Sequence, residues 1–341
     1  PYVLAAWGAI CHARKDRRTL ARMATGFAFA SLGLFMYMNI SDHEVRTREY
    51  FWVPAYVGLA VWMGIGCGAL VEWFKQLGRS WRITIAVALI AFSVQPLWMS
   101  YFQMDRSGNS VAYHYGRNMI NFLEEDSILI TNGDNDTFPL WYLQQVEGVR
   151  PDVDIVNLSL IQINWYIEQL KDRGLPMSFS YEQIAQMHPY WSRDPQTGEL
   201  ELVTLRDIAV HDIIRENNWE RPIYFAVTVD DFMGYYDNLK LEGMSFRLVP
   251  ETERHQIDEE RTRENVFENY RYDSLVDVED NWRVMDEIYK PATTRRLVTN
   301  YAAGFSRLGF KAVQKEPSDL DEAIRFYELG PMFPPVNSTS L

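Results

Sequence analysis

Long apolar stretches separated by short charged loops occupy the first hundred residues of the chain. Three of them, at residues 23–40, 50–74 and 83–102, come close to the twenty or so residues that a helix needs to cross a bilayer. Residues 1–11 have the pattern of the end of a further span. Because only helices and closed barrels satisfy their own backbone in lipid, the pattern predicts a multi-pass α-helical membrane segment over residues 1–102.

The charges of the loops predict how these spans are oriented. Residues 12–22 carry five Lys/Arg against one acid, residues 75–82 carry three Lys/Arg and no acid, and residues 41–49 are mixed. Short basic loops stay on the cytoplasmic side. We therefore expect residues 41–49 and everything after Phe102 to be extracytoplasmic.

Two glycines of the second span, Gly64 and Gly68, have the GxxxG spacing. This spacing favours the close approach of another helix. The alternative is a chance cluster, because glycine is common in membrane helices.

After residue 102 the pattern changes to short apolar strands alternating with amphipathic helices. This order predicts a parallel α/β layer in an extracytoplasmic domain over residues 103–250, with an irregular excursion at 181–203. The predicted elements are a helix at 118–125, a strand at 127–131, a turn at 132–139, a helix at 140–146, a strand at 153–157, helices at 161–171 and 205–217, and a strand at 222–229.

Residues 251–341 form a highly charged region, with helical runs predicted at 261–270 and 280–289. Its end, at 299–313 and 320–328, has the pattern of a tetratricopeptide-like helical hairpin. One such unit cannot bury its own face, so further units are expected beyond Leu341.

Charge divides the chain in the same way. Residues 1–102 hold 10 Lys/Arg and 5 Asp/Glu, which leaves 23 and 41 for residues 103–341, a net charge of −18. A domain this acidic repels phosphate backbones, so no nucleic-acid partner is expected. Cys11 and Cys67 both lie in the apolar half, which excludes a disulfide framework or a cysteine metal site in the rest.

A turn at the end of a predicted strand carries the first candidate site, Asp134, Asn135 and Asp136. Ligands favour the carboxyl ends of the strands in an α/β sheet, and a D-x-D pair can hold a hard divalent cation through oxygen. In the other interpretation, Asp136 or Thr137 caps the next helix and Pro139 lies in its first turn.

The predicted outside loop carries the second candidate site. Arg46 and Arg48 could grip a diphosphate at the membrane surface by forked hydrogen bonds. A mixed charged loop with internal ion pairs is the alternative. No sequence motif of a nucleophile with its base, of a zinc protease or of a phosphate-binding loop is present.

Five strings of the sequence, in this order, resemble one known family. They are EVRTREYFWV at 44–53, the segment from ITNGDNDTFPLW to DIVNLSL at 130–160, NNWERPIYFAVTV at 217–229, NYAAGFSRLGF at 300–310 and DEAIRFYELGPMFPP at 321–335. The family is a large group of bacterial multi-spanning proteins, long of unknown function, related to a eukaryotic membrane protein O-mannosyltransferase. It resembles the C-type glycosyltransferases.

The resemblance implies a many-helix membrane body, a lipid-phosphate sugar donor and an extracytoplasmic end with tetratricopeptide-like repeats. The catalytic carboxylate of such enzymes is expected in a first outside loop upstream of Pro1, so this part of the protein is expected to be inactive alone. Glu44, Arg46 and Arg48 match the family's loop pattern and would complete the donor-phosphate site.

The expected function is transfer of a sugar, mannose by resemblance, from a lipid carrier to protein hydroxyls outside the bacterial inner membrane. The expected partners are membrane lipid, the lipid-linked sugar and a protein acceptor. No cofactor is expected beyond a divalent cation at Asp134 and Asp136. The alternative is a non-enzymatic scaffold that is anchored in the membrane and recruits proteins.

Overall fold

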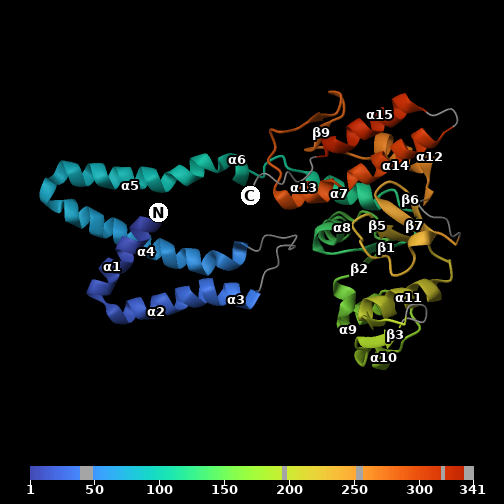
Figure 1. Cartoon of the computed structure of the whole chain (residues 1–341), viewed down its shortest axis with the longest axis horizontal. Coiled ribbons are helices and arrows are strands. Elements are labelled where there is room, and N and C mark those ends of the chain that lie inside the picture. Colours follow the sequence, from blue (N-terminus) through green and yellow to red (C-terminus); the bar gives the residue numbers. More distant parts are fainter. Residues whose placement is uncertain (39–48, 194–197, 251–255, 316–318, 334–341) are drawn as a thin grey trace. The chain divides into compact units, whose positions relative to one another are not determined.

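The chain folds into two compact units, Pro1–Asp105 and Arg106–Leu341. The computed structural model describes residues 1–38, 49–193, 198–250, 256–315 and 319–333 (Figure 1). Each unit is described by itself below.

The first unit is entirely helical in the residues that the structure describes. Its elements are α1 (Tyr2–Lys15), α2 (Arg17–Ala28), the π-helix η1 (Phe29–Gly33), α3 (Leu34–Met38), η2 (Glu49–Trp52), α4 (Val53–Trp73), η3 (Phe74–Leu77), α5 (Arg79–Met99) and α6 (Tyr101–Met104). Three continuous helices, Arg17–Met38, Tyr50–Trp73 and Arg79–Met99, are long and apolar enough to cross a membrane. These three coincide with the three predicted spans, while their orientation in a bilayer stays a prediction.

The glycine at which α1 and α4 come together is Gly66, between the two predicted ones. A Cβ on Gly66 would lie 2.3 Å from the carbonyl oxygen of Leu4, and a Cβ on Gly8 would lie 1.8 Å from that of Trp62. Nothing lies within 4 Å of a Cβ on Gly64 or on Gly68. Helices α1 and α4 thus cross backbone to backbone at Gly8 and Gly66, and the GxxxG prediction selected the wrong glycines because a spacing does not say which helix face is covered.

Replacing Gly66 by leucine is expected to destabilise the first unit by at least about 2 kcal/mol, because the backbone of α1 cannot move aside without separating the helices. The midpoint of thermal unfolding in detergent micelles measures the effect. Gly64→Leu, which meets open space, is the matched control and should leave the midpoint nearly unchanged. Equal losses in the two variants would contradict the crossing.

The second unit is built on a mixed six-stranded sheet in the order β2-β1-β5-β7-β6-β8. Its strands are β1 (Ile128–Thr131), β2 (Asp154–Asn157), β5 (Ile223–Ala226), β6 (Leu239–Leu241), β7 (Ser245–Leu248) and β8 (Gln256–Ile257). β1 pairs in parallel with β2 and β5, as predicted, but β7 runs antiparallel to both β5 and β6. The predicted parallel layer is therefore confirmed for β1, β2 and β5, while the three strands that were not predicted make the whole sheet mixed. β8 pairs with β6, so the sheet continues past the predicted domain boundary at residue 250.

Helices lie on both sides of this sheet (Figure 1). The α-helices are α7 (Val111–Ile120), α8 (Asp134–Glu147), α9 (Asn164–Asp172), α10 (Tyr181–Ala185), α11 (Leu205–Asn217), α12 (Glu259–Glu264), α13 (Ala292–Val298), α14 (Tyr301–Gln314) and α15 (Leu320–Leu329). The shorter turns of helix are η4 (Leu160–Gln162), η5 (Tyr236–Asn238), η6 (Asn265–Asn269, a π-helix) and η7 (Gly330–Met332).

The helix predicted at 118–125 lies earlier in the chain, as α7. It ends at Ile120 because the guanidinium group of Arg150 collects the carbonyl oxygens that follow. Arg150 donates to the carbonyls of Ile120, Asn121, Leu123 and Glu124 at 2.8–3.2 Å. An arginine thirty residues away thus replaces the continuation of the helix.

Two further local predictions were wrong. The stretch 181–203, expected to be irregular, contains α10 and the hairpin of β3 (Tyr190–Arg193) and β4 (Leu200–Val203). The helix expected at 280–289 is replaced by the hairpin of β9 (Val276–Asp277) and β10 (Arg283–Val284).

Backbone conformation explains the second of these errors. Asn281 and Trp282 have φ of 50° and 62°, in the left-handed region that a right-handed helix cannot contain. Arg283 still pairs with Asp280 and Glu287. These are the i,i+3 and i,i+4 charge pairs that imitate a helical sequence.

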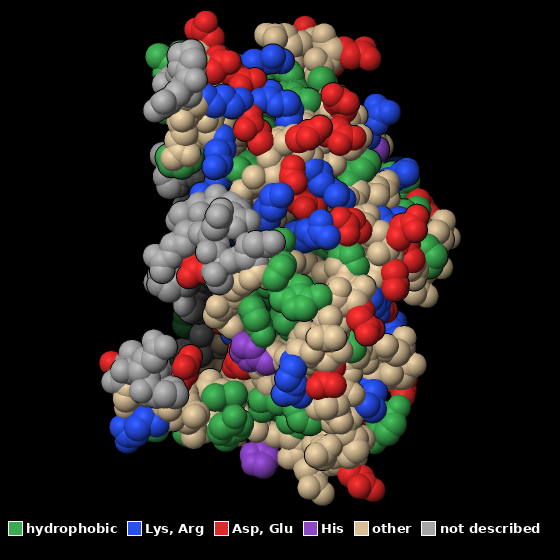
Figure 2. Space-filling model, turned by 90° about the vertical axis from the view of Figure 1, so that its right-hand side faces the viewer, with side chains coloured by type: hydrophobic (Ala, Val, Ile, Leu, Met, Phe, Trp, Pro, Cys, Tyr) green, Lys and Arg blue, Asp and Glu red, His purple; other side chains and the backbone are tan. Residues whose placement is uncertain are grey.

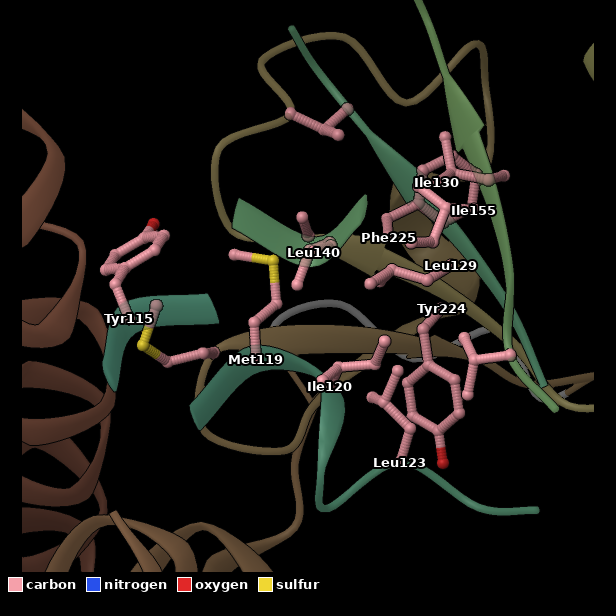
Figure 3. Close-up of a cluster of buried hydrophobic side chains, with 14 of the residues drawn as sticks. Tyr115, Met119, Ile120, Leu123, Leu129, Ile130, Leu140, Ile155, Tyr224 and Phe225 are labelled. Atoms are coloured by element: carbon pink, nitrogen blue, oxygen red, sulfur yellow. The ribbon is translucent and has the colours of Figure 1, made fainter. Parts of the chain in front are cut away.

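The core of the second unit lies between α7, α8 and the parallel strands (Figure 3). Met119 and Ile120 of α7 face Leu129 of β1 and Phe225 of β5, all of them fully buried, while the ring of Tyr115 lies against that of Tyr301 of α14. At the other end, α14 and α15 form the predicted helical hairpin, and the Tyr327 ring occupies the space over Gly309. Its relation to tetratricopeptide repeats stays a prediction. On the face in Figure 2, acidic and basic side chains are interspersed, in keeping with the many ion pairs of this unit.

Candidate functional site

The carboxyl ends of the three parallel strands meet at one edge of the sheet. From β1 the chain crosses through α8 to β2 on one side, and from β2 it returns through α11 to β5 on the other. β1 is therefore the point where the strand order reverses, and open α/β sheets bind ligands outside such a point. The loops that follow the strands begin at Asn132, Leu158 and Val227.

Asp136 joins two of these loops from the inside. Its carboxylate accepts hydrogen bonds from the backbone N–H groups of Asn132 at 2.8 Å and Gly133 at 3.0 Å. It also accepts one from the Thr228 hydroxyl at 2.5 Å. The side chain is only 2% exposed. Asp136 thus caps the start of α8 and ties the loop after β1 to the loop after β5.

A second layer of hydrogen bonds brings in the loop after β2. The Thr137 hydroxyl lies 2.7 Å from that of Thr131 and accepts from the Asn157 side-chain amide at 2.8 Å. The Asn157 side-chain oxygen in turn accepts from the Ser159 N–H, and the Ser159 hydroxyl donates to the Asn132 carbonyl at 2.9 Å. All three loops are therefore held by one continuous polar network.

The three predicted residues at this edge are separated by the turn of the helix. Asp136 is buried, Asp134 is half-buried and Asn135 is exposed. Both oxygens of Asp136 already accept protein hydrogen bonds, which supports the capping alternative for this residue. In the described residues, no group of three or more His, Cys, Asp and Glu side chains is arranged to hold a metal ion. A cation at Asp134 and Asp136 stays a prediction.

The chemistry available at this edge is recognition. Asp134, Asn135 and Ser159 are polar groups suited to the hydroxyls of a sugar or a peptide backbone. The buried hydroxyls of Thr131 and Thr137 are paired with each other and with Asn157. The site can orient a polar ligand on a rigid scaffold.

The donor-phosphate residues Glu44, Arg46 and Arg48 lie outside the described residues, between α3 and η2. Their predicted role is therefore not tested by the structure.

Sequence reasoning missed Thr228, Asn157 and Ser159 at this edge. Asn157 is the last residue of β2, Ser159 comes two residues later, and Thr228 comes two residues after the end of β5, so the carboxyl ends of the predicted strands were the available signal. It also missed a buried ionic cluster in which Glu242, 4% exposed, forms an ion pair with Arg261 at 3.0 Å. Burial raises the pKa of Glu242, and the two arginines Arg261 and Arg247 oppose this. Arg247 also pairs with Glu124 at 2.6 Å, which attaches the end of α7 to the sheet.

Comparison with known proteins places these residues in a family context. The family model described as TMEM260-associated domain 2 matches residues 112–190 and 196–266. The chain is 29% identical over 184 residues to "Protein O-mannosyl-transferase TMEM260" of Mus musculus, covering 51% of this chain and 26% of that protein. It is 19% identical over 304 residues to "Protein O-mannosyl-transferase tmem260" of Dictyostelium discoideum, covering 81% and 35%.

The chain thus spans between about a quarter and a third of the length of these curated relatives. No solved structure matches it significantly. The matched domain includes the carboxyl edge of β1, β2 and β5. The alignment with the Dictyostelium discoideum relative covers 81% of the chain. The second unit, residues 106–341, is a smaller share of the chain than this, so the alignment must extend into the helical first unit.

Proposed function

We propose that this chain, which the matches relate to the TMEM260 family, is part of a membrane glycosyltransferase that moves mannose onto protein hydroxyl groups. The single observation that carries the proposal is the alignment with the relative of Dictyostelium discoideum, which is named a protein O-mannosyl-transferase and whose match extends into both units. Three helices of membrane-spanning length in the first unit fit an enzyme that works at a bilayer. A sugar donor and a protein acceptor follow from this activity.

The donor in this proposal is a lipid-linked sugar phosphate. Glu44, Arg46 and Arg48 belong to the segment between the first two membrane-length helices. Guanidinium groups there would neutralise the lipid phosphate as it leaves, which is the point where charge develops in the transfer.

The reaction is proposed on the extracytoplasmic side of the bacterial inner membrane. The end of α1, the first half of α2 and residues 75–82 carry eight of the ten Lys/Arg residues in residues 1–102. Basic connections are retained in the cytoplasm, so the second unit would be delivered to the other side. There its polar edge, formed by the loops after β1, β2 and β5, would hold and orient the acceptor.

Replacing both Arg46 and Arg48 by alanine is expected to lower mannose transfer by at least about 100-fold, the usual cost of a lost group that stabilises developing charge. The assay follows transfer from a lipid-linked mannose donor to an acceptor protein, using the membrane protein that carries this chain. The double variant Arg17→Ala/Arg18→Ala, on the proposed cytoplasmic side, is the matched control.

The outcomes separate the two candidate functions. Loss in the first variant with normal transfer in the control supports the donor site. Unchanged transfer in both variants removes the donor-site role but keeps the enzyme. Absence of transfer by the wild-type protein favours the scaffold, in which the second unit only recruits proteins to the membrane surface.

A further inference from the structure

A cavity of about 440 Å³ lies between α7 and the segment that follows η6, away from the edge described above. Three basic or potentially basic side chains line it, His114 and Arg117 of α7 and Arg271. Asn121 and Asn269 add side-chain amides, and Asp273 is the one acid among the lining residues. A cavity with this composition is unusual in a unit whose net charge is strongly negative.

Among the residues that the structure describes, the two arginines of this cavity have no carboxylate partner. Arg117 donates to the Tyr113 hydroxyl at 3.1 Å and lies over its ring. Across residues 106–333, with the gaps given above, neither Arg117 nor Arg271 forms an ion pair. Eight other arginines of the unit are paired with acids, namely Arg150, Arg206, Arg215, Arg221, Arg247, Arg261, Arg263 and Arg283.

A buried amide holds Arg271 in place beside α7. The Asn118 side chain is 2% exposed, donates to the Arg271 carbonyl at 2.7 Å and accepts from the Arg271 N–H at 2.9 Å. It also donates to the Tyr301 hydroxyl at 2.8 Å. Because Asn118 is the neighbour of Arg117, this clamp fixes both arginines on the same cavity before any ligand arrives.

The positive charge of the cavity comes from the two arginines and not from His114. Burial lowers the pKa of His114, Asp273 opposes the shift from 3.5 Å, and Arg117 and Arg271 lower the pKa further. The imidazole is therefore neutral at neutral pH. Its Nδ1 is buried and has no hydrogen-bond partner within the described part of the chain.

We propose that this cavity binds a phosphate group, held by the guanidinium groups of Arg117 and Arg271 with the Asn121 amide and the His114 imidazole beside them. Forked guanidinium groups match phosphate oxygens, and such charge-assisted hydrogen bonds are the strong ones. The phosphate could belong to a soluble ligand or to the headgroup of an anionic lipid, which share this chemistry. The inference does not depend on the proposed transferase activity.

The experiment measures phosphate binding to the whole chain in two settings. In detergent micelles, inorganic phosphate is titrated while the melting temperature is followed. In nanodiscs of phosphatidylcholine, the melting temperature is compared with and without phosphatidylglycerol. The variants are Arg117→Gln and Arg271→Gln, and the control is Arg173→Gln, which removes the same charge from an exposed site at the end of α9.

The expected result is a saturable rise in melting temperature in one or both settings for the wild type and the control. Each cavity variant should weaken the apparent affinity by about tenfold or more, since hydrogen bonds to charged groups are worth at least that. A rise with inorganic phosphate identifies a soluble ligand, and a rise with phosphatidylglycerol alone identifies a lipid headgroup. No rise in either setting, or equal rises in all variants, would overturn the proposal. The melting temperatures without phosphate show whether each variant is folded.

Discussion

Replacing Arg150 by alanine is expected to lower the free energy of unfolding of the second unit by about 3 kcal/mol, because four carbonyl oxygens at the end of α7 lose their donor. Asp152, which accepts from the same guanidinium at 2.7 Å, loses its partner as well. For a unit of this size the melting temperature should fall by about 6–12 °C. The measurement is thermal unfolding of the whole chain in detergent micelles.

Two comparisons separate this role from a loss of charge. Arg173→Ala removes an exposed arginine and should change the melting temperature little. Arg150→Lys keeps the positive charge but not the planar guanidinium group with its several donors. Its melting temperature should therefore lie between those of Arg150→Ala and the wild type. If Arg150→Ala and Arg173→Ala behave alike, Arg150 does not cap α7.

The same pair predicts a dependence on pH. Hydrogen bonds from Arg150 lower the pKa of Asp152 from 3.8 to about 2. A carboxyl whose pKa is depressed in the folded state adds stability above its unfolded pKa and loses it as the pH falls through its folded pKa. The stability difference between the wild type and Asp152→Asn should therefore shrink as the pH falls from about 4 to about 2, and a constant difference would count against the pairing.

Replacing Asp136 by alanine is expected to cost about 3 kcal/mol, because two backbone N–H groups and the Thr228 hydroxyl lose a charged acceptor inside the protein. The melting temperature should fall by about 6–12 °C. Asp134→Ala, two residues away and half-buried, is the matched control with a smaller expected loss, about 1 kcal/mol from the helix dipole. Equal losses would argue against the internal role of Asp136.

These two variants also test the predicted cation. A Ca²⁺ or Mn²⁺ titration that raises the melting temperature of the wild type, and not of Asp134→Ala, would support a cation at Asp134 and Asp136. In the capping interpretation both Asp136 oxygens are already used by hydrogen bonds within the protein. Under that interpretation, adding Ca²⁺ or Mn²⁺ should not raise the melting temperature. The titration therefore decides between the two interpretations of the D-x-D pair.

The elements that the sequence predicted well are those whose signal is local. The three long apolar helices, α11 with its Thr204 cap, and the buried strands β1 and β2 all follow from hydropathy, capping residues and β-branched side chains. The resemblance to a glycosyltransferase-like family rested on strings of residues, and the comparisons support that relation. The position of Asp134 and Asp136 after the carboxyl end of β1 was predicted from the order of strand and turn, and the binding of a ligand there stays a prediction.

The errors arose where distant residues decide local structure. Arg150 ends α7 thirty residues away, and the left-handed Asn281 and Trp282 turn a helix-like charge pattern into a hairpin. Asp136 was foreseen as a ligand or a cap, but only its burial beside Thr228 gives both of its oxygens to the protein. Which glycine of the second span meets α1 depends on the face that α1 covers, and spacing alone does not contain that information.

By itself, then, the sequence determined that the chain has membrane-length helices followed by an acidic α/β unit, because hydropathy, net charge and capping are properties of neighbouring residues. The tertiary structure alone decided that β7 joins the sheet antiparallel, that Gly66 rather than Gly64 forms the helix crossing, and that Arg117 and Arg271 share one cavity. Each of these is a contact between residues far apart in the chain, and such contacts are selected by the packing of the whole unit.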